Sequence, residues 1–316
     1  MNTVFVVGSL NIDQNVRVRS LPRSGETVSG TDATFSPGGK GGNQAVAAAR
    51  AGAAVEFMGA VGDDAHGRRI LEVLTQARVD CSHVPVVEAV PTGTAIIAVD
   101  DAGENLIIVS PGANAKLTKQ DIDTFLSSVR RGDVLILQLE ISAVLVRHAA
   151  RQAKVRGALV VLNAAPAPAA IDGLFDDVDL LVVNEHEIRV LAELTGVPPA
   201  DHRELVRTLP ALLGPRIVCT AGDEGAYTLL DNTLLHVPAP AVDATDTTGA
   251  GDTFIGYLAA CLLANPADLA GAMTLSSRAS ALAVTRTGAM ESIPWLHELE
   301  PVSLLPSARP ASVIPS

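Results

Sequence analysis

Residues 4–13 read Val-Phe-Val-Val-Gly-Ser-Leu-Asn-Ile-Asp, a short apolar run followed at once by glycine and polar residues. The first four side chains are β-branched or aromatic and do not alternate with polar ones, which is typical of a strand covered by helices on both faces. Comparable apolar runs occur at residues 55–59, 134–137, 159–162, 180–183 and 217–219. We predict a buried strand at each of these six places.

Longer amphipathic stretches lie between these runs and predict helices at residues 43–51, 67–77, 119–130, 144–155 and 185–194. Strands that alternate with helices are joined by right-handed crossovers, and the strands then lie parallel. The predicted fold class is therefore α/β, with a doubly wound, mostly parallel sheet flanked by helices.

Two segments interrupt this alternation. Residues 14–36 carry short strands with Pro and Gly but no helix, and residues 93–110 predict a hairpin with its turn at 100–104. We expect the two segments to form a small antiparallel sheet outside the main one, which serves as a lid or as an oligomer contact. The α/β domain then spans residues 1–300, and residues 301–316, with four Pro and four Ser, predict a disordered tail.

Composition excludes several classes of protein. The chain has 316 residues, and 23 Lys and Arg against 35 Asp and Glu give a net charge of −12, which argues against a nucleic-acid partner. The longest apolar run, residues 254–264, is about half of a membrane-spanning helix. The N-terminus lacks the basic segment of a secretory signal, and the three cysteines form no Cys-x-x-Cys pair. We expect a cytoplasmic protein.

Polar residues follow the predicted strands, and in a doubly wound sheet ligands bind at that edge. Taken singly, each is better explained as a helix cap or turn, but their recurrence favours a site. These residues are Asn11 and Asp13 after the first strand, Gln138 and Glu140, Asn184 and Glu187, and Thr220, Gly222 and Gly225.

The strongest local motif is Asp246-Thr247-Thr248-Gly249-Ala250-Gly251-Asp252-Thr253-Phe254, which opens a predicted apolar helix. Backbone amides in a first helical turn bind anions, and Asp252 among them fits a base that takes a proton from an attacking hydroxyl. A helix cap with a tight turn explains the motif equally well. The chain has neither a Walker A loop nor a dinucleotide fingerprint at its glycine-containing motifs. Gly39-Lys40 is followed by Gly41 in place of Ser or Thr, and Gly249-x-Gly251 has Phe254 where a third Gly is required.

A second motif, Pro37-Gly38-Gly39-Lys40-Gly41-Gly42-Asn43-Gln44, predicts a flexible or closely approached loop ahead of a helix. Its amides are suited to sugar hydroxyls, although a mobile turn is the simpler interpretation of a lone glycine-rich loop.

The two motifs together make the chain resemble the ribokinase family of carbohydrate kinases (the phosphofructokinase-B type), and most of all its ribokinase members. The resemblance runs from about Val4 to Trp295. It implies an ATP-dependent sugar kinase with a β-sheet lid that also forms a homodimer contact, and it implies Mg²⁺ and an activating monovalent cation, K⁺, as cofactors.

The resemblance also implies roles for individual residues. Asp252 corresponds to the catalytic base, and the amides of Gly249, Ala250 and Gly251 to the anion hole. The implied sugar ligands are Asn11, Asp13, Gly39, Lys40, Gly41, Gly42, Asn43, Glu140 and Asp252. The implied nucleotide contacts are Asn184, Glu187, Thr220, Ala221, Gly222, Asp223, Glu224, Gly225, Gly251, Asp252 and Ser277, with Glu187 organising Mg²⁺. The implied K⁺ loops contain Asp246, Thr248, Ala283, Arg286, Gly288 and Ser292.

Two positions depart from the family pattern, and neither change removes a catalytic group. The second residue of the anion-hole run is Gly249, which other members of the broad family also use. Beside the adenine, where ribokinases often carry Asn, this chain has Ser277, or Ser276 if the preceding loop is shifted.

The residue types also constrain the substrate. Asn11, Asp13 and Glu140 accept hydrogen bonds from hydroxyls, and two carboxylates would repel a phosphorylated sugar. A nucleoside would need an aromatic platform, and the motifs offer none apart from Phe35. We expect a free pentose, D-ribose converted to D-ribose 5-phosphate. The alternatives are another free sugar such as deoxyribose, a nucleoside, or a non-catalytic sugar sensor.

Overall fold

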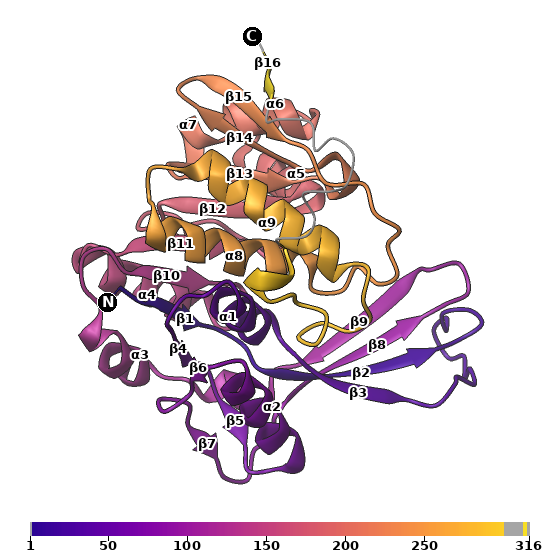
Figure 1. Cartoon of the computed structure of the whole chain (residues 1–316). Coiled ribbons are helices and arrows are strands. Elements are labelled where there is room, and N and C mark those ends of the chain that lie inside the picture. Colours follow the sequence, from indigo (N-terminus) through magenta and orange to yellow (C-terminus); the bar gives the residue numbers. More distant parts are fainter. Residues whose placement is uncertain (1, 300–311, 315–316) are drawn as a thin grey trace.

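A ten-stranded sheet forms the centre of the computed structural model, which describes residues 2–299 and 312–314 (Figure 1). Its strand order is β16-β15-β14-β13-β12-β11-β10-β1-β4-β6. The strands from β13 to β6 pair in parallel, whereas β14, β15 and β16 are antiparallel. Their bounds are β1 Val4–Val7, β4 Val55–Met58, β6 Val79–Asp80, β10 Val134–Leu137, β11 Leu159–Asn163, β12 Leu180–Asn184, β13 Arg216–Thr220, β14 Ala226–Leu230, β15 Thr233–Val237 and β16 Ser312–Ile314.

Strand β1 lies between β10 and β4, with Val4 in register with Val134 and Val55. All four of its residues are buried. Val4 and Val6 belong to one hydrophobic core, and Phe5 and Val7 to a second. A strand buried on both faces has no solvent-exposed face that needs polar side chains, which explains the uninterrupted apolar run in the sequence.

Each core is closed by its own layer of helices. The first core is covered by α1 Lys40–Arg50, α2 Ala65–Gln76, α8 Ala250–Ala264 and α9 Leu269–Ala283. The second is covered by α3 Lys119–Phe125, α4 Ala143–Val155, α5 Glu185–Thr195 and α6 His202–Thr208, and α6 is followed by the short α7 Pro210–Leu213. The doubly wound α/β fold is thereby confirmed.

Helices α1 and α8 pack closely, and this brings the two sequence motifs together. A Cβ atom added at Gly256 would lie 2.4 Å from Cβ of Ala47 and 2.5 Å from the Gln44 carbonyl oxygen. Glycine and alanine are therefore needed where the two helices meet.

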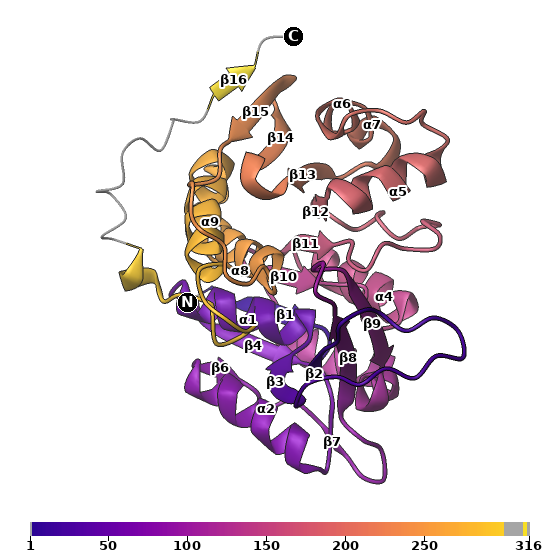
Figure 2. The same cartoon turned by 90° about the vertical axis from the view of Figure 1, so that its right-hand side faces the viewer.

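A second, smaller sheet lies beside the main one, with strand order β3-β2-β8-β9. Its strands are β2 Asn11–Arg17, β3 Thr34–Gly38, β8 Gly93–Val99 and β9 Asn105–Ser110. Figure 1 shows it projecting from the body of the molecule, and in Figure 2, turned by 90°, it faces the viewer. The expectation of an antiparallel sheet is wrong in one respect, because β2 and β8 pair in parallel. The two segments lie side by side as separate antiparallel hairpins, and their inner strands run in the same direction. A two-stranded pair, β5 Val61–Gly62 with β7 Val86–Val87, is also parallel.

Three local expectations need correction. Helix α3 ends at Phe125, before the predicted Arg130, and the hydroxyls of Ser127 and Ser128 donate to the carbonyls of Thr124 and Phe125 just beyond. Such side-chain bonds compete with helical ones. Most of the predicted disordered tail lies outside the described residues, but Ser312–Ile314 pair with β15, so the expectation of disorder does not hold for them.

Helix α1 starts at Lys40, three residues earlier than predicted. Five of the eight residues of the glycine-rich motif are therefore helix and not loop. Across residues 2–299 and 312–314, the structure contains no helix of the length and apolar character that a bilayer requires.

Candidate active site

Asp252 lies in the first turn of α8, at the carboxyl ends of the sheet strands. Asn43 donates a hydrogen bond to its Oδ2 atom and Gln44 donates one to its Oδ1 atom, each at 2.8 Å. Burial raises the pKa of Asp252, and the nearby Lys40 ammonium and these two amides offset part of that rise. The carboxylate is thus held in one orientation by donors from the glycine-rich motif.

The start of α1 needs glycine because it packs directly on the chain after β1. Gly39 caps the helix with φ of 89°, and a Cβ atom there would lie 2.8 Å from the Asn11 backbone nitrogen. At Gly41 a Cβ atom would lie 2.6 Å from the Ser9 nitrogen. The glycines therefore serve close packing and leave Lys40 and Asn43 facing the site.

Three predicted sugar ligands cluster beside Asp252. Glu140 accepts a hydrogen bond from the Lys40 backbone nitrogen at 3.0 Å and another from the Ser9 hydroxyl. The Asp13 carboxylate lies against Gly38, where a Cβ atom would approach Oδ2 to 2.1 Å. Asn11 is buried and its Oδ1 atom accepts from Asn114 at 2.9 Å. Sequence reasoning missed Asn114, which has no motif of its own.

The charges of this cluster interact strongly. Burial, together with the negative charges of Glu140 and Asp252, raises the pKa of Asp13 to about 7. Burial lowers the pKa of Lys40, but Asp252, Glu140 and the other surrounding carboxylates outweigh it and raise that pKa. The lysine therefore stays charged among acidic groups, which leaves a polar, hydroxyl-binding environment.

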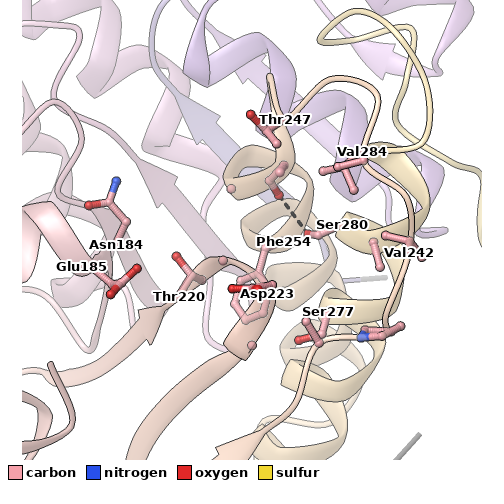
Figure 3. A pocket seen from close by; sticks show the side chains of 18 of the residues that line it. Asn184, Glu185, Thr220, Asp223, Val242, Thr247, Phe254, Ser277, Ser280 and Val284 are labelled. Carbon is pink, nitrogen blue, oxygen red and sulfur yellow. Dashed lines mark hydrogen bonds between the residues drawn. The ribbon is translucent and has the colours of Figure 1, made fainter. Parts of the chain in front are cut away.

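A cavity of about 890 Å³ opens on the other side of the α8 N-terminus. Figure 3 shows Asn184 and Thr220 on one side of it and Val242, Ser280 and Val284 on the other. Eight of the predicted nucleotide or anion-hole residues line this cavity, and they are Asn184, Thr220, Gly222, Asp223, Gly225, Ala250, Gly251 and Ser277. Both serines are buried, but the Ser276 hydroxyl donates to the Ala272 carbonyl, and Ser277 is the one that lines the cavity.

Much of the cavity wall is apolar and was not predicted. It comes from the segment after β15, from Phe254 and from the end of α9, with Ala239, Pro240, Ala241, Val242, Ala244, Ala281 and Val284 as members. A slot of this character suits a flat aromatic base. The small residues of 239–244 carry no recognisable motif, which is why the sequence did not reveal them.

Four predicted nucleotide contacts do not line the cavity. Ala221 is buried, and the Glu224 carboxylate accepts hydrogen bonds from Arg203 at 2.6 Å and Tyr227 at 2.9 Å on the far side of its loop. Asp252 faces Asn43 and Gln44 instead. Glu187 is buried and completes a capping box with Asn184, in which each side chain binds the backbone nitrogen of the other at 2.8 Å.

Glu187 nevertheless interacts electrostatically with Lys40 and Asp252. Burial raises its pKa, the Asn184 amide and Lys40 offset part of that rise, and Asp252 adds to it. A carboxylate and an amide oxygen at the start of a helix are oxygen donors of the kind that Mg²⁺ accepts.

The anion-hole amides lie in the first turn of α8, where helical geometry offers no acceptor within the helix. Gly249 caps the helix with φ of 75°. The Ala250 amide donates a long 3.3 Å bond to the Thr247 carbonyl. A Cβ atom added at Gly251 would meet no protein atom within 4 Å, so Gly251 faces open space in the cavity.

The predicted K⁺ loops also meet. The Asp246 carboxylate accepts the amides of Thr248 and Gly288, both at 2.9 Å, and its backbone nitrogen donates to the Val284 carbonyl. Ser292 is buried, whereas the Arg286 side chain turns to Glu298 at 2.7 Å. Within the described residues, no group of three or more His, Cys, Asp or Glu side chains is arranged to hold a metal ion. Carbonyls and one carboxylate, however, are the oxygen ligands that suit a monovalent cation.

Comparison with known proteins gives consistent results. Residues 1–296 match the model of the pfkB family of carbohydrate kinases. A ribokinase of Staphylococcus aureus is 34% identical over 302 residues, which covers 95% of this chain and 99% of the relative. A deoxyribokinase of Salmonella typhi is 33% identical over 299 residues, covering 93% and 96%. The structure of an Arabidopsis thaliana ribokinase complexed with ribose and ATP superposes with a TM-score of 0.85 at 29% identity, covering 96% of this chain and all of the other.

Proposed function

The chain belongs to the pfkB family of carbohydrate kinases and is an ATP-dependent carbohydrate kinase, and from this premise we propose that it transfers the γ-phosphoryl group of ATP to the primary hydroxyl of D-ribose. The products are ADP and D-ribose 5-phosphate. The ribokinase relatives and the ribose and ATP complex of the Arabidopsis protein support this choice of substrates.

One observation carries the proposal. Gly251 and Asp252 are neighbours in the first turn of α8, but Gly251 lines the cavity and Asp252 binds the Asn43 and Gln44 side chains. A nucleotide on one side and a sugar on the other would meet at this turn. Phosphoryl transfer consists mainly of such positioning together with stabilisation of charge.

The chemistry assigned to each residue follows from its surroundings. Asp252 accepts the proton of the attacking hydroxyl, and its raised pKa strengthens it as a base once it is ionised. The first-turn amides, Gly251 foremost, stabilise the negative charge on the phosphoryl group. Asp13, Glu140 and Lys40 orient the sugar through its hydroxyls.

Two cations fit the residues present. Glu187 and Asn184 would hold Mg²⁺, which supplies positive charge to the nucleotide phosphates. The loops of Asp246 and residues 283–292 would hold K⁺ next to the start of α8. We expect higher turnover in K⁺ than in Na⁺ at equal ionic strength. Equal turnover in the two would contradict activation by K⁺ at these loops.

The small sheet has two roles in this proposal. It closes over the sugar, since β2 and β3 carry Asn11, Asp13 and Gly38, and closure excludes water that would hydrolyse ATP. It also forms a homodimer contact, because every residue of β9 is exposed and its sequence, Asn-Leu-Ile-Ile-Val-Ser, is mostly apolar.

Deoxyribose is the second candidate, because a deoxyribokinase is nearly as similar to this chain as the ribokinases are. A coupled ADP-release assay over a panel of D-ribose, 2-deoxy-D-ribose, other free sugars and adenosine discriminates between them. We expect the highest kcat/KM with D-ribose. A higher kcat/KM with deoxyribose or adenosine would identify that compound, and not ribose, as the preferred substrate. If no member of the panel stimulates ATP consumption, the kinase proposal itself is contradicted.

A further inference from the structure

Gln44 follows Asn43 in the glycine-rich motif, and its side chain has no solvent exposure. Its amide nitrogen donates to Oδ1 of Asp252 at 2.8 Å and approaches Oδ1 of Asn163 at 3.3 Å. Its amide oxygen accepts from Nε2 of Gln138 at 2.7 Å. A fully buried polar side chain with all of these contacts is neither a surface group nor a sugar ligand.

The orientation of this chain of amides is fixed by the carboxylate at its end. An ionised carboxylate only accepts hydrogen bonds, so Gln44 must turn its NH₂ group toward Asp252. The Gln44 oxygen then faces Gln138, which must present its own NH₂ group in turn. Reversing either amide would place two acceptors, or two donors, against each other in a site without solvent.

The remaining neighbours hold the chain in place. Asn163, at the end of β11, donates to the Val182 carbonyl at 3.1 Å and is thereby tied to the neighbouring strand β12. Gln138, just after β10, occupies the space that a side chain at Gly8 would take, since a Cβ atom there would lie 1.9 Å from its Oε1 atom. Three adjacent strands of the main sheet, β1, β10 and β11, therefore support Gln44.

We infer that Gln44 is a positioning residue for the reaction, that it orients the Asp252 carboxylate toward the sugar hydroxyl, and that Gln138 and Asn163 fix the orientation of the Gln44 amide. This inference rests on the proposed function, in which Asp252 is the base. Gln44 itself touches neither substrate and acts through Asp252.

Several charged groups also act on Asp252, and the effect of Gln44 must be separated from theirs. Lys40 on α1 and Glu140 after β10 are the strongest charged neighbours. Asp13 on β2 and Glu187 on α5 interact with it as well. A Gln44→Met substitution leaves all four in place and keeps the length of the side chain. It removes the N–H donor to Asp252 and also the oxygen that accepts from Gln138.

The test compares Gln44→Met with the wild type in two ways. The pKa of Asp252 is measured by ¹³C NMR of protein labelled at its Asp carboxyl carbons, and the Asp252 signal is identified by its absence from Asp252→Asn. The dependence of kcat on pH is measured with the best sugar of the panel. Gln76→Met, which replaces an exposed glutamine of α2 that donates a long 3.5 Å hydrogen bond to Glu72, is the matched control.

We expect Gln44→Met to raise the Asp252 pKa by about one unit, since a hydrogen bond to the charged form is lost. The pH below which kcat falls should rise by the same amount. Near neutral pH, kcat should fall about tenfold or more, while the sugar KM changes less than about threefold. Gln138→Met should shift both in the same direction by less. Gln76→Met should match the wild type.

An unchanged Asp252 pKa and acid limb in folded Gln44→Met would overturn the inference, because a purely structural role lowers stability without moving either. If Gln44→Met does not fold, Gln138→Met decides the question by the same two measurements. A wild type that phosphorylates no free sugar would contradict the proposed function, and the NMR titration would still decide whether Gln44 controls the Asp252 carboxylate.

Discussion

Asn43 donates a 2.8 Å hydrogen bond to Oδ2 of Asp252 across a separation of 209 residues in sequence. The bond joins the first turn of α1 to the first turn of α8, and each helix begins with one of the two glycine-containing motifs. Neither motif alone makes a site. The glycine-rich motif supplies the donors, the second motif supplies the carboxylate, and the close packing of α1 on α8 holds them in contact.

The ionised Asp13 carboxylate should destabilise the folded protein at alkaline pH when no substrate is bound. Its pKa rises from 3.8 to about 7 on folding, so between these values the folded state binds more protons than the unfolded chain. Stability therefore falls as pH rises through this window. Asp13→Asn removes the cost, which amounts to at most about 4 kcal/mol. We expect the variant to be more stable than the wild type at pH 8, similar to it near pH 4, and deficient in sugar binding.

Urea unfolding at the two pH values measures this difference. The exposed Asp101→Asn at the tip of the β8–β9 turn is the control and should change neither value. If Asp13→Asn were equally destabilised at both pH values, ionisation of Asp13 would not lower the stability of the wild type.

Gly251 should be needed for ATP and not for folding. A methyl group there meets no protein atom, and alanine is a better helix former than glycine by up to about 1 kcal/mol. We expect Gly251→Ala to keep or raise the melting temperature but to raise the KM for ATP about tenfold or more, because the methyl group would occupy the space proposed for phosphate.

Gly249→Ala provides the contrast. Its φ of 75° is unfavourable for alanine by about 1 kcal/mol, so this variant should lose stability as well as activity. Thermal melts and ATP saturation curves separate the two cases. Normal ATP kinetics in Gly251→Ala would place the phosphates elsewhere.

The exposed β9 strand should mediate the dimer. Ile107 and Ile108 are 55% and 57% exposed, which is unusual for adjacent isoleucines on a free surface. We expect the wild type to sediment as a dimer and the double variant Ile107→Asp, Ile108→Asp to dissociate at least about tenfold more readily. Val155→Asp, at a 78% exposed position on α4, controls for the added charge and should remain dimeric. A monomeric wild type would exclude this role for β9.

The main sheet could be predicted from sequence because its parallel strands are buried on both faces. Runs such as Leu180–Val183 are apolar throughout and stand out from the amphipathic helices. The β14–β15 hairpin was missed although it carries a signal, since Asp231 and Asn232 form a two-residue turn with positive φ at both positions.

The parallel pairing of β2 with β8 could not be predicted in the same way. It joins segments that are distant in sequence, and each hairpin alone is compatible with either direction.

The site was predictable where chemistry requires a residue type in a motif. Asp252, Lys40 and Asn43 fall in this class, and the structure brings them together. Asn114 and the apolar walls at residues 239–244 are set by packing between distant segments and leave no local pattern. Glu224 shows the opposite error, because its neighbours in sequence line the cavity while its own side chain turns outward to Arg203.

Asp252 is the proposed base in phosphoryl transfer to a free sugar. Asp252→Asn keeps the size of the side chain, removes the charge and leaves Asn43 and Gln44 in place. The decisive measurement is its kcat with D-ribose and ATP, with ribose affinity determined in parallel by calorimetry. We predict that kcat falls by about 10²–10⁴-fold while the ribose Kd changes less than about threefold. A variant that binds ribose normally and turns over at near the wild-type rate would contradict the account.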